Sequence, residues 1–131
     1  MRNPKRKVYL DTSSLIRFFT KDDKNKAEKV KEVLEKEKYL IIPDVVFPEI
    51  EYILRRLYKT ERTEIIKIFQ FLTSLTNLKL SKTIKQAITI FETTHLDVAD
   101  CLIAASSLGN KLASFDNDLL KTPGVTSYWE K

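Results

Sequence analysis

The chain has 131 residues, of which 43% are hydrophobic and 31% are charged, and its formal net charge is +5 at pH 7. This length fits a single domain over residues 1–131 that buries a substantial core. No apolar run approaches the ~20 residues that a membrane span needs, and we expect no signal peptide. The single cysteine, Cys101, excludes an internal disulfide and is typical of a protein in a reducing cytoplasm.

The hydrophobic pattern predicts short strands that alternate with helices along the chain. The first predicted strand covers 7–10 and is followed by a short helix capped within 12–14 and by a helix opened by Asp22 or Asp23. A second strand over 39–42 leads to a helix over 46–58, with Ile50, Ile53, Leu54 and Leu57 inward, and to a helix begun by Thr60 or Thr63. A third strand over 78–80, helices over 83–93 and 97–108, a strand over 112–115 and a candidate fifth strand over 125–128 complete the chain. This alternation predicts the α/β class, with helices packed around a parallel sheet.

Four acidic residues follow the strands of this predicted sheet. Asp11 and Asp116 come directly after strands, whereas Glu49 and Asp100 lie on helices after the second and third strands. Ligands of open parallel sheets bind beyond the carboxyl ends of the strands, so we expect all four on one side. Converging carboxylates repel one another, and their hard oxygen atoms favour Mg²⁺ or Mn²⁺ as the partner.

Each acid also has a purely structural interpretation. Asp11 suits a helix cap, Glu49 suits the first turn of its helix, and Asp97 is expected to cap the helix after it. Asp100 is harder to explain, because it precedes an apolar stretch beside which an unpaired carboxylate is costly. Asp97 lies three residues before it and can share its face. Asp118 lies two residues after Asp116, and a metal ligand and a helix cap explain it equally well.

Other kinds of catalytic site fit the chain less well. The only histidine, His95, is expected to be a cap or a surface residue, and Cys101 a core residue, so a zinc site is disfavoured. No serine has an evident histidine partner, and the two glycines form no phosphate-binding loop. A metal-activated water is the remaining nucleophile. The net positive charge suits a polyanionic substrate, although on charge alone solvated helix faces are the simpler explanation.

Four short blocks of the chain resemble the successive motifs of PIN domains, most closely those of VapC-type toxin ribonucleases. The blocks are residues 8–13 (VYLDTS), 43–49 (PDVVFPE), 96–105 (LDVADCLIAA) and 114–118 (SFDND). The resemblance implies a three-layer α/β/α sandwich with a central parallel sheet. It also implies a Mg²⁺- or Mn²⁺-dependent endoribonuclease, commonly a homodimer, that a cognate antitoxin inhibits by occupying the active-site groove.

The resemblance assigns roles to individual residues of this chain. It implies that Asp11, Glu49, Asp100 and Asp116 are the acidic quartet, with Asp97 and Asp118 as assisting acids. Thr12 or Ser13, together with Ser114, match hydroxyl positions that hydrogen-bond the carboxylates. The family often carries Asn at the position of Ser13.

These observations predict a hydrolytic mechanism and several contacts. Water would attack the RNA phosphodiester in line and leave a 5′-phosphate and a 3′-hydroxyl. Four basic residues are candidates for guiding the RNA backbone: Lys5, Arg6, Arg55 and Arg56. The apolar surplus at Phe69, Phe71 and Leu72 suggests a dimer or antitoxin contact.

Three alternatives stay open at this point. They are an RNA-processing nuclease outside a toxin–antitoxin pair, a non-catalytic RNA-binding PIN domain, and an aspartyl phosphotransferase. The last is disfavoured because Ser13 stands where a second aspartate is needed.

Overall fold

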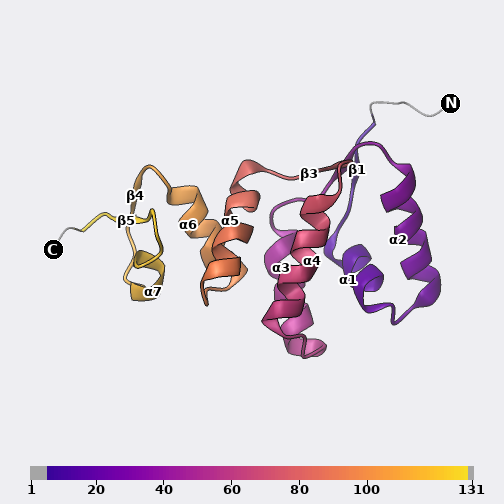
Figure 1. Cartoon of the computed structure of the whole chain (residues 1–131), viewed down its shortest axis with the longest axis horizontal. Coiled ribbons are helices and arrows are strands. Elements are labelled where there is room, and N and C mark those ends of the chain that lie inside the picture. Colours follow the sequence, from indigo (N-terminus) through magenta and orange to yellow (C-terminus); the bar gives the residue numbers. More distant parts are fainter. Residues whose placement is uncertain (1–5, 130–131) are drawn as a thin grey trace. The chain divides into compact units, whose positions relative to one another are not determined.

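The computed structural model describes residues 6–129, which form twelve short elements (Figure 1). The helices are α1 (Thr12–Thr20), α2 (Lys24–Lys36), α3 (Val46–Leu57), α4 (Arg62–Ser74), α5 (Lys82–Thr93), α6 (Val98–Ser107) and α7 (Asn117–Leu120). The strands are β1 (Val8–Tyr9), β2 (Leu40–Ile41), β3 (Leu78–Lys79), β4 (Lys111–Leu112) and β5 (Thr126–Ser127). These elements form two compact units, Met1–Leu80 (unit 1) and Ser81–Lys131 (unit 2).

Unit 1 is built on three parallel strands in the order β1-β2-β3. Val8 is paired with Leu40, and Leu40 with Leu78, so β2 lies between the other two strands. Neighbouring parallel strands need long crossover connections. Helices α1 and α2 lie within the connection from β1 to β2, and α3 and α4 lie within the next one.

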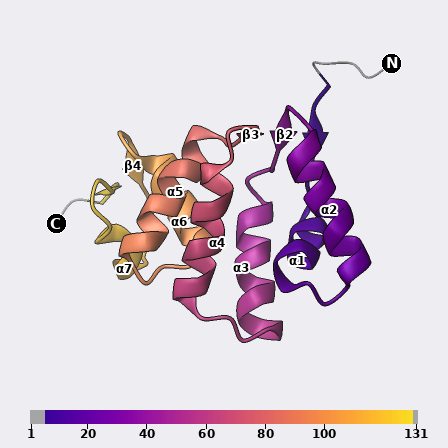
Figure 2. The ribbon, with the colours of Figure 1, turned by 45° about the vertical axis from the view of Figure 1, so that its right-hand side comes forward.

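The helices of unit 1 cover this small sheet with their apolar faces. Helix α1 packs against both α2 and α3, and α3 also contacts α4 (Figure 2). The most deeply buried side chains come from all these layers and include Leu15, Leu40, Phe47, Ile50 and Phe69. Phe47 and Phe69 meet edge to face at 5.3 Å between ring centroids, a favoured aromatic geometry. Glu51 is also buried, at 4% exposure, on the same side of α3 as Phe47 and Leu54.

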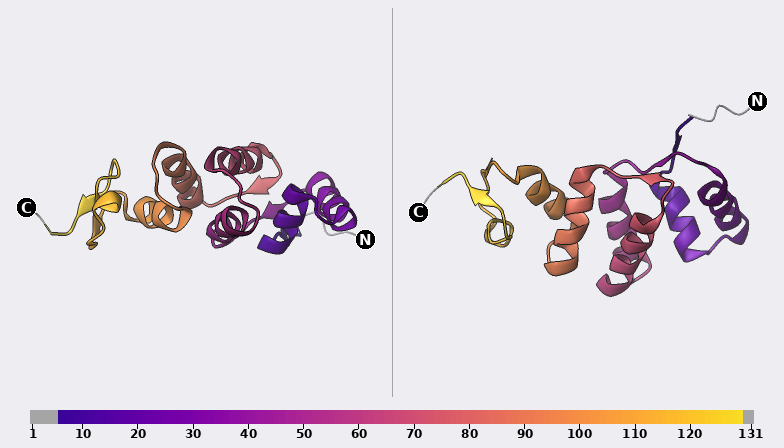
Figure 3. Two further views of the ribbon diagram at one scale, coloured as in Figure 1. Left: turned by 90° about the horizontal axis from the view of Figure 1, so that it is seen from below. Right: turned by 45° about the horizontal axis from the view of Figure 1, so that its top comes forward.

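Unit 2 consists of the helix pair α5 and α6, the short helix α7 and the parallel pair β4 and β5. Helices α5 and α6 pack side by side (Figure 3). Their inward residues are fully or almost fully buried, among them Ile84, Ala87, Phe91, Cys101 and Ala104. Gly109 follows the end of α6 with a φ of 81°, a conformation that glycine adopts without steric cost.

The predicted α/β class with parallel strands is confirmed, as is the candidate fifth strand. Each strand is only two residues long, and β4 (Lys111–Leu112) begins one residue before the predicted run 112–115 and shares only Leu112 with it. Within residues 6–129 the strands pair as one group of three and one group of two, one group in each unit.

Several helix details differ from the prediction. Of the two caps that the sequence offered for α1, the structure has Asp11 and not residues 12–14, and Glu61, not a threonine, precedes α4. Leu57 was expected to face the core but is 73% exposed, because the buried side of α3 runs through Phe47, Ile50, Glu51 and Leu54. Of the three residues of the apolar surplus on α4, Phe69 and Leu72 are core residues and Phe71 is exposed, so a dimer or antitoxin contact at this helix stays a prediction that rests on Phe71.

Candidate active site

Asp11 lies two residues beyond β1 and is the N-cap of α1. Its Oδ1 accepts hydrogen bonds from the backbone N–H of Ser14 and from Oγ of Ser13, each at 2.9 Å. These two donors, the Ser14 N–H first, lower the pKa of the Asp11 carboxyl, because they favour the charged form. Asp11 is therefore an exposed carboxylate with a fixed direction and a stable negative charge.

Glu49 lies in the first turn of α3 and is linked to the start of α1. Thr12 donates a hydrogen bond from Oγ1 to Oε1 of Glu49 at 2.5 Å. Both acids of unit 1 line one pocket of about 1000 Å³, together with side chains of α1 and α3. The hydrogen bond from Thr12 thus links Glu49 to the residue that follows Asp11, although the two acids are 38 positions apart in the sequence.

The acids of unit 2 crowd around the first turn of α6. Asp97 caps the helix by accepting the backbone N–H of Asp100 at 2.8 Å, as predicted. Asp100 is half-buried, and burial raises the pKa of its carboxyl above the ordinary range. The negative charges of Asp97 and Asp116 raise this pKa further.

Asp116 is the N-cap of α7, where its Oδ1 accepts the N–H groups of Asp118 at 3.0 Å and of Leu119 at 3.2 Å. Asp118 lies exposed in the first turn of the same helix. Ser114 was expected to hydrogen-bond a carboxylate. Instead, its Oγ accepts the backbone N–H of Asp116 at 3.0 Å, so it holds the main chain of the acid.

The donor atoms of these acids suit a hard divalent cation. All six candidate ligand side chains are carboxylates. A bound cation would offset the effects of burial and of the Asp97 and Asp116 charges, which raise the pKa of Asp100. In the part of the chain that is described, no three acidic, histidine or cysteine side chains form a ready-made metal-binding group. The pair Asp11 and Glu49 belongs to unit 1, and the pair Asp100 and Asp116 to unit 2, so the convergence of the quartet stays a prediction.

The candidate RNA-binding arginines all have partners. Arg6 forms an ion pair with Glu37 at 2.7 Å, and Arg55 with the buried Glu51 at 3.5 Å. The guanidinium carbon of Arg56 lies 5.6 Å from the centroid of the Tyr52 ring, a cation–π contact. Lys5 lies outside the described residues. Their contact with RNA stays a prediction.

The structure agrees with the structural roles that were predicted for the only histidine and the only cysteine of the chain. His95 is exposed between α5 and α6, as expected for a surface residue. Cys101 is buried, as expected for a core residue.

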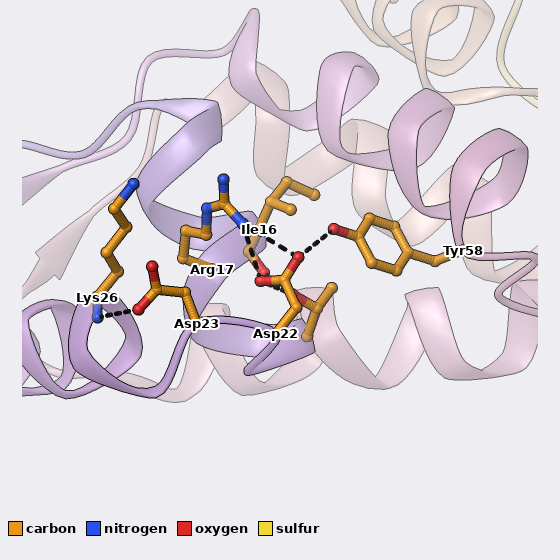
Figure 4. Close-up of polar contacts among 7 residues, drawn as sticks. Ile16, Arg17, Asp22, Asp23, Lys26 and Tyr58 are labelled. Carbon is orange, nitrogen blue, oxygen red and sulfur yellow. Dashed lines mark hydrogen bonds and ion pairs between the residues drawn. The ribbon is translucent and has the colours of Figure 1, made fainter.

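Three side chains of the unit 1 pocket were missed from the sequence: Arg17, Tyr52 and Tyr58. Nη1 of Arg17 donates to both carboxylate oxygens of Asp22 at 3.1 Å, and the hydroxyl of Tyr58 donates to Oδ2 of Asp22 at 2.7 Å (Figure 4). The sequence could have indicated two of them, because Arg17 lies one helical turn after Ser13 and Tyr52 lies one turn after Glu49, which places each near a candidate site residue. The sequence did not indicate the hydrogen bond between Tyr58 and Asp22, because these residues are 36 positions apart.

The chain matches the family model of the PIN domain over residues 8–125. It therefore belongs to the PIN domain family, and the predicted PIN-like α/β/α fold class is confirmed. Comparison with curated proteins and with solved structures gave no match. Family membership supports a nuclease, a hydrolase that acts on nucleic acid. Among the described helices, none is both long and apolar enough to cross a membrane.

Proposed function

We propose that this protein is a Mg²⁺- or Mn²⁺-dependent endoribonuclease that hydrolyses RNA phosphodiester bonds. The family match over residues 8–125 supports a nuclease, and the observation that points to a cation is the half-buried carboxyl of Asp100, directly after its cap Asp97 in the first turn of α6. Burial, and then the negative charges of Asp97 and Asp116, raise the pKa of this carboxyl. Such an arrangement is costly without a compensating cation. Asp11 and Glu49 add two exposed carboxylates that follow the sheet of unit 1.

In this proposal Asp11, Asp100 and Asp116 hold the ion, and Glu49 joins them or orients the attacking water. Asp97 and Asp118 assist from the neighbouring positions. When bound, such an ion would lower the pKa of a water molecule that it holds and would neutralise negative charge on the phosphoryl group. Ser13 fixes the direction of the Asp11 carboxylate, and Thr12 that of Glu49. Hydrolysis by water gives a 5′-phosphate and a 3′-hydroxyl.

We further propose that the nuclease is a cytoplasmic toxin of a type II toxin–antitoxin pair and acts as a homodimer. The support is the order and spacing of its four motif blocks, which resemble those of VapC-type toxins. A cognate antitoxin is then the expected protein partner, and RNA the substrate. An RNA-processing nuclease would share the same site, so cellular behaviour distinguishes the two.

The test compares the full-length chain with Asp100→Asn in an RNA cleavage assay with Mn²⁺. We expect cleavage to fall by at least ~100-fold, since even partners behind a metal ligand commonly contribute 10–100-fold. The RNA fragments that the unaltered protein produces should carry 5′-phosphates. Glu28→Gln, an exposed acid of α2, is the matched control and should cleave normally. Full activity of a folded Asp100→Asn variant would reject the assignment.

Two further readouts separate the finer claims. RNA binding without any turnover in Mn²⁺ would indicate a non-catalytic RNA-binding domain. In cells, a toxin arrests growth when induced, and Asp100→Asn does not. Normal growth on induction of an active nuclease would indicate an RNA-processing role instead.

A further inference from the structure

The pocket of unit 1 carries side chains that the proposed hydrolysis does not use. Beside Asp11 and Glu49 it is lined by Arg17, Tyr52 and Tyr58. We propose that this pocket binds one nucleotide of single-stranded RNA next to the cleaved phosphate, with its base stacked on Tyr52 and its phosphate bound by Arg17. This inference rests on the proposed nuclease function and names the form of RNA that the site takes.

Tyr52 provides a stacking surface close to the acidic pair. Its side chain is 56% exposed although it lines a pocket, and it follows Glu49 by three residues on α3, which places both on one side of the helix. The cation–π contact with Arg56, one further turn along α3, helps to hold the ring in place. A fixed, accessible aromatic ring beside carboxylates is the arrangement that unstacked RNA bases bind.

Arg17 provides a positive charge for the phosphate. Asp22 accepts from Nη1 of Arg17 and from the Tyr58 hydroxyl, so one carboxylate fixes both pocket side chains (Figure 4). The bond from Tyr58 and then those from Arg17 lower the pKa of the Asp22 carboxyl, which therefore stays charged in its role. Within residues 6–129, the side-chain hydrogen bonds of Arg17 run through Nη1 alone. Its Nε and Nη2 groups are left for a bidentate contact to a phosphate.

The chemistry of the pocket matches the parts of a nucleotide. Apolar side chains such as Ile16, Val46 and Ile53 line it together with the tyrosines. Its volume of about 1000 Å³ is at the upper end of the range for small-ligand sites. A base can reach such a pocket only when it is unpaired, so a single strand is expected to bind and a duplex is not.

The test measures binding, separately from cleavage. A fluorescein-labelled oligouridine is titrated with the full-length chain in EDTA, and its anisotropy gives the dissociation constant. Tyr52→Ala should weaken binding by about 5- to 100-fold, the range expected for loss of one stacked base. Tyr52→Phe keeps the ring and should bind like the unaltered chain. Tyr39→Ala is the matched control, because Tyr39 is 49% exposed but does not line this pocket.

Arg17 is tested by the salt dependence of the same titration. Arg17→Gln should reduce the slope of log affinity against log salt by about 0.7, the value for one phosphate of a single strand. Arg17→Lys should keep most of the slope. A duplex of the same length should be insensitive to Tyr52→Ala.

The outcomes separate this inference from the proposed function. If Tyr52→Ala binds RNA as tightly as Tyr39→Ala does, the inference is overturned, and the apolar pocket is assigned to a protein partner. If Mn²⁺ supports Asp100-dependent cleavage in the same preparation, the nuclease proposal survives that failure. If Tyr52→Ala weakens binding but no cleavage occurs, the nucleotide pocket stands and the hydrolytic function fails.

Discussion

Among the acidic residues of the candidate site, Asp100 has surroundings that oppose its negative charge. It lies in the first turn of α6, where the helix N-terminus favours a negative charge. Burial and the charges of Asp97 and Asp116 nevertheless raise the pKa of its carboxyl. The ionised form of Asp100 therefore lowers the stability of the metal-free protein.

This imbalance predicts that Asp100→Asn stabilises the protein in EDTA. Because the folded-state pKa lies above the unfolded value, the penalty is absent at about pH 3 and is fully present at about pH 7. We expect a higher free energy of unfolding at neutral pH, on the order of 0.5 kcal/mol after screening by solvent. Thermal unfolding should show a Tm about 2 °C higher at neutral pH and no difference in acid.

The exposed Asp118, in the first turn of α7, provides the comparison for that measurement. Its neutralisation in Asp118→Asn should give no gain in Tm, because a negative charge near a helix N-terminus is favourable. A lower Tm for Asp100→Asn at neutral pH would show that the Asp100 charge is already compensated within the protein.

For single residues, the sequence predicts local roles such as a helix cap better than it predicts contacts with distant parts of the chain. The positions of Asp97 as a cap and Cys101 as a core residue follow from local pattern, and the structure confirms them. Glu51 was missed because its position on α3 is an inward one, where an apolar residue is expected, and its burial depends on tertiary packing. Asp22 was predicted only as a helix opener, because its contact with Tyr58 joins distant parts of the chain.

At the scale of elements, three of the candidate acids have a second role as helix caps. Asp11 caps α1, Asp97 caps α6 and Asp116 caps α7. Asparagine caps a helix about as well as aspartate, whereas alanine does not. Substitution by asparagine therefore tests the charge of these residues, and substitution by alanine would also weaken the helix.

The N-cap of α5 offers a test of unit 2 that leaves the acids untouched. Oγ of Ser81 accepts the backbone N–H of Ile84 at 3.0 Å. Ser81→Ala should lower the free energy of unfolding by about 1 kcal/mol, because that donor loses its partner. Ser81→Asp should keep the cap and the stability. Urea denaturation of both variants measures the difference, and equal midpoints for Ser81→Ala and the unaltered chain would exclude a contribution from this cap.

The helices are the elements that the sequence predicts best. The helix predicted over 83–93 is α5, and the apolar residues Ile84, Ala87, Ile88 and Phe91, which recur at helical spacing, are all buried. The strand positions were predicted too, except that β4 lies at Lys111–Leu112 and not over 112–115. The strand lengths were not predicted, because an apolar run does not reveal how many residues find a partner strand. On α3, Leu57 was predicted to be buried but is exposed. Helical periodicity alone does not show where the last turn of a helix leaves the core.

For the whole molecule, the family match spans residues 8–125 and so includes both compact units. Each unit contributes two acids of the expected quartet, Asp11 and Glu49 from one, and Asp100 and Asp116 from the other. The order of the motifs predicts that these pairs act together, as one domain over residues 1–131. A cation held by acids of both units would make their stabilities depend on each other.

A double-mutant experiment with Mn²⁺ tests this dependence directly. A ligand at a hundredfold excess over its Kd stabilises the folded state by about 2.7 kcal/mol, roughly 10 °C in Tm for a chain of this size. We expect Mn²⁺ to raise the Tm of the unaltered chain in calorimetry, and Asp11→Asn and Asp100→Asn each to remove most of that rise. In the proposed site both residues would bind the same ion, so the double variant is then expected to lose no more than either single variant. If Asp11→Asn keeps the full rise while Asp100→Asn loses it, the cation is held by the acids of unit 2 alone.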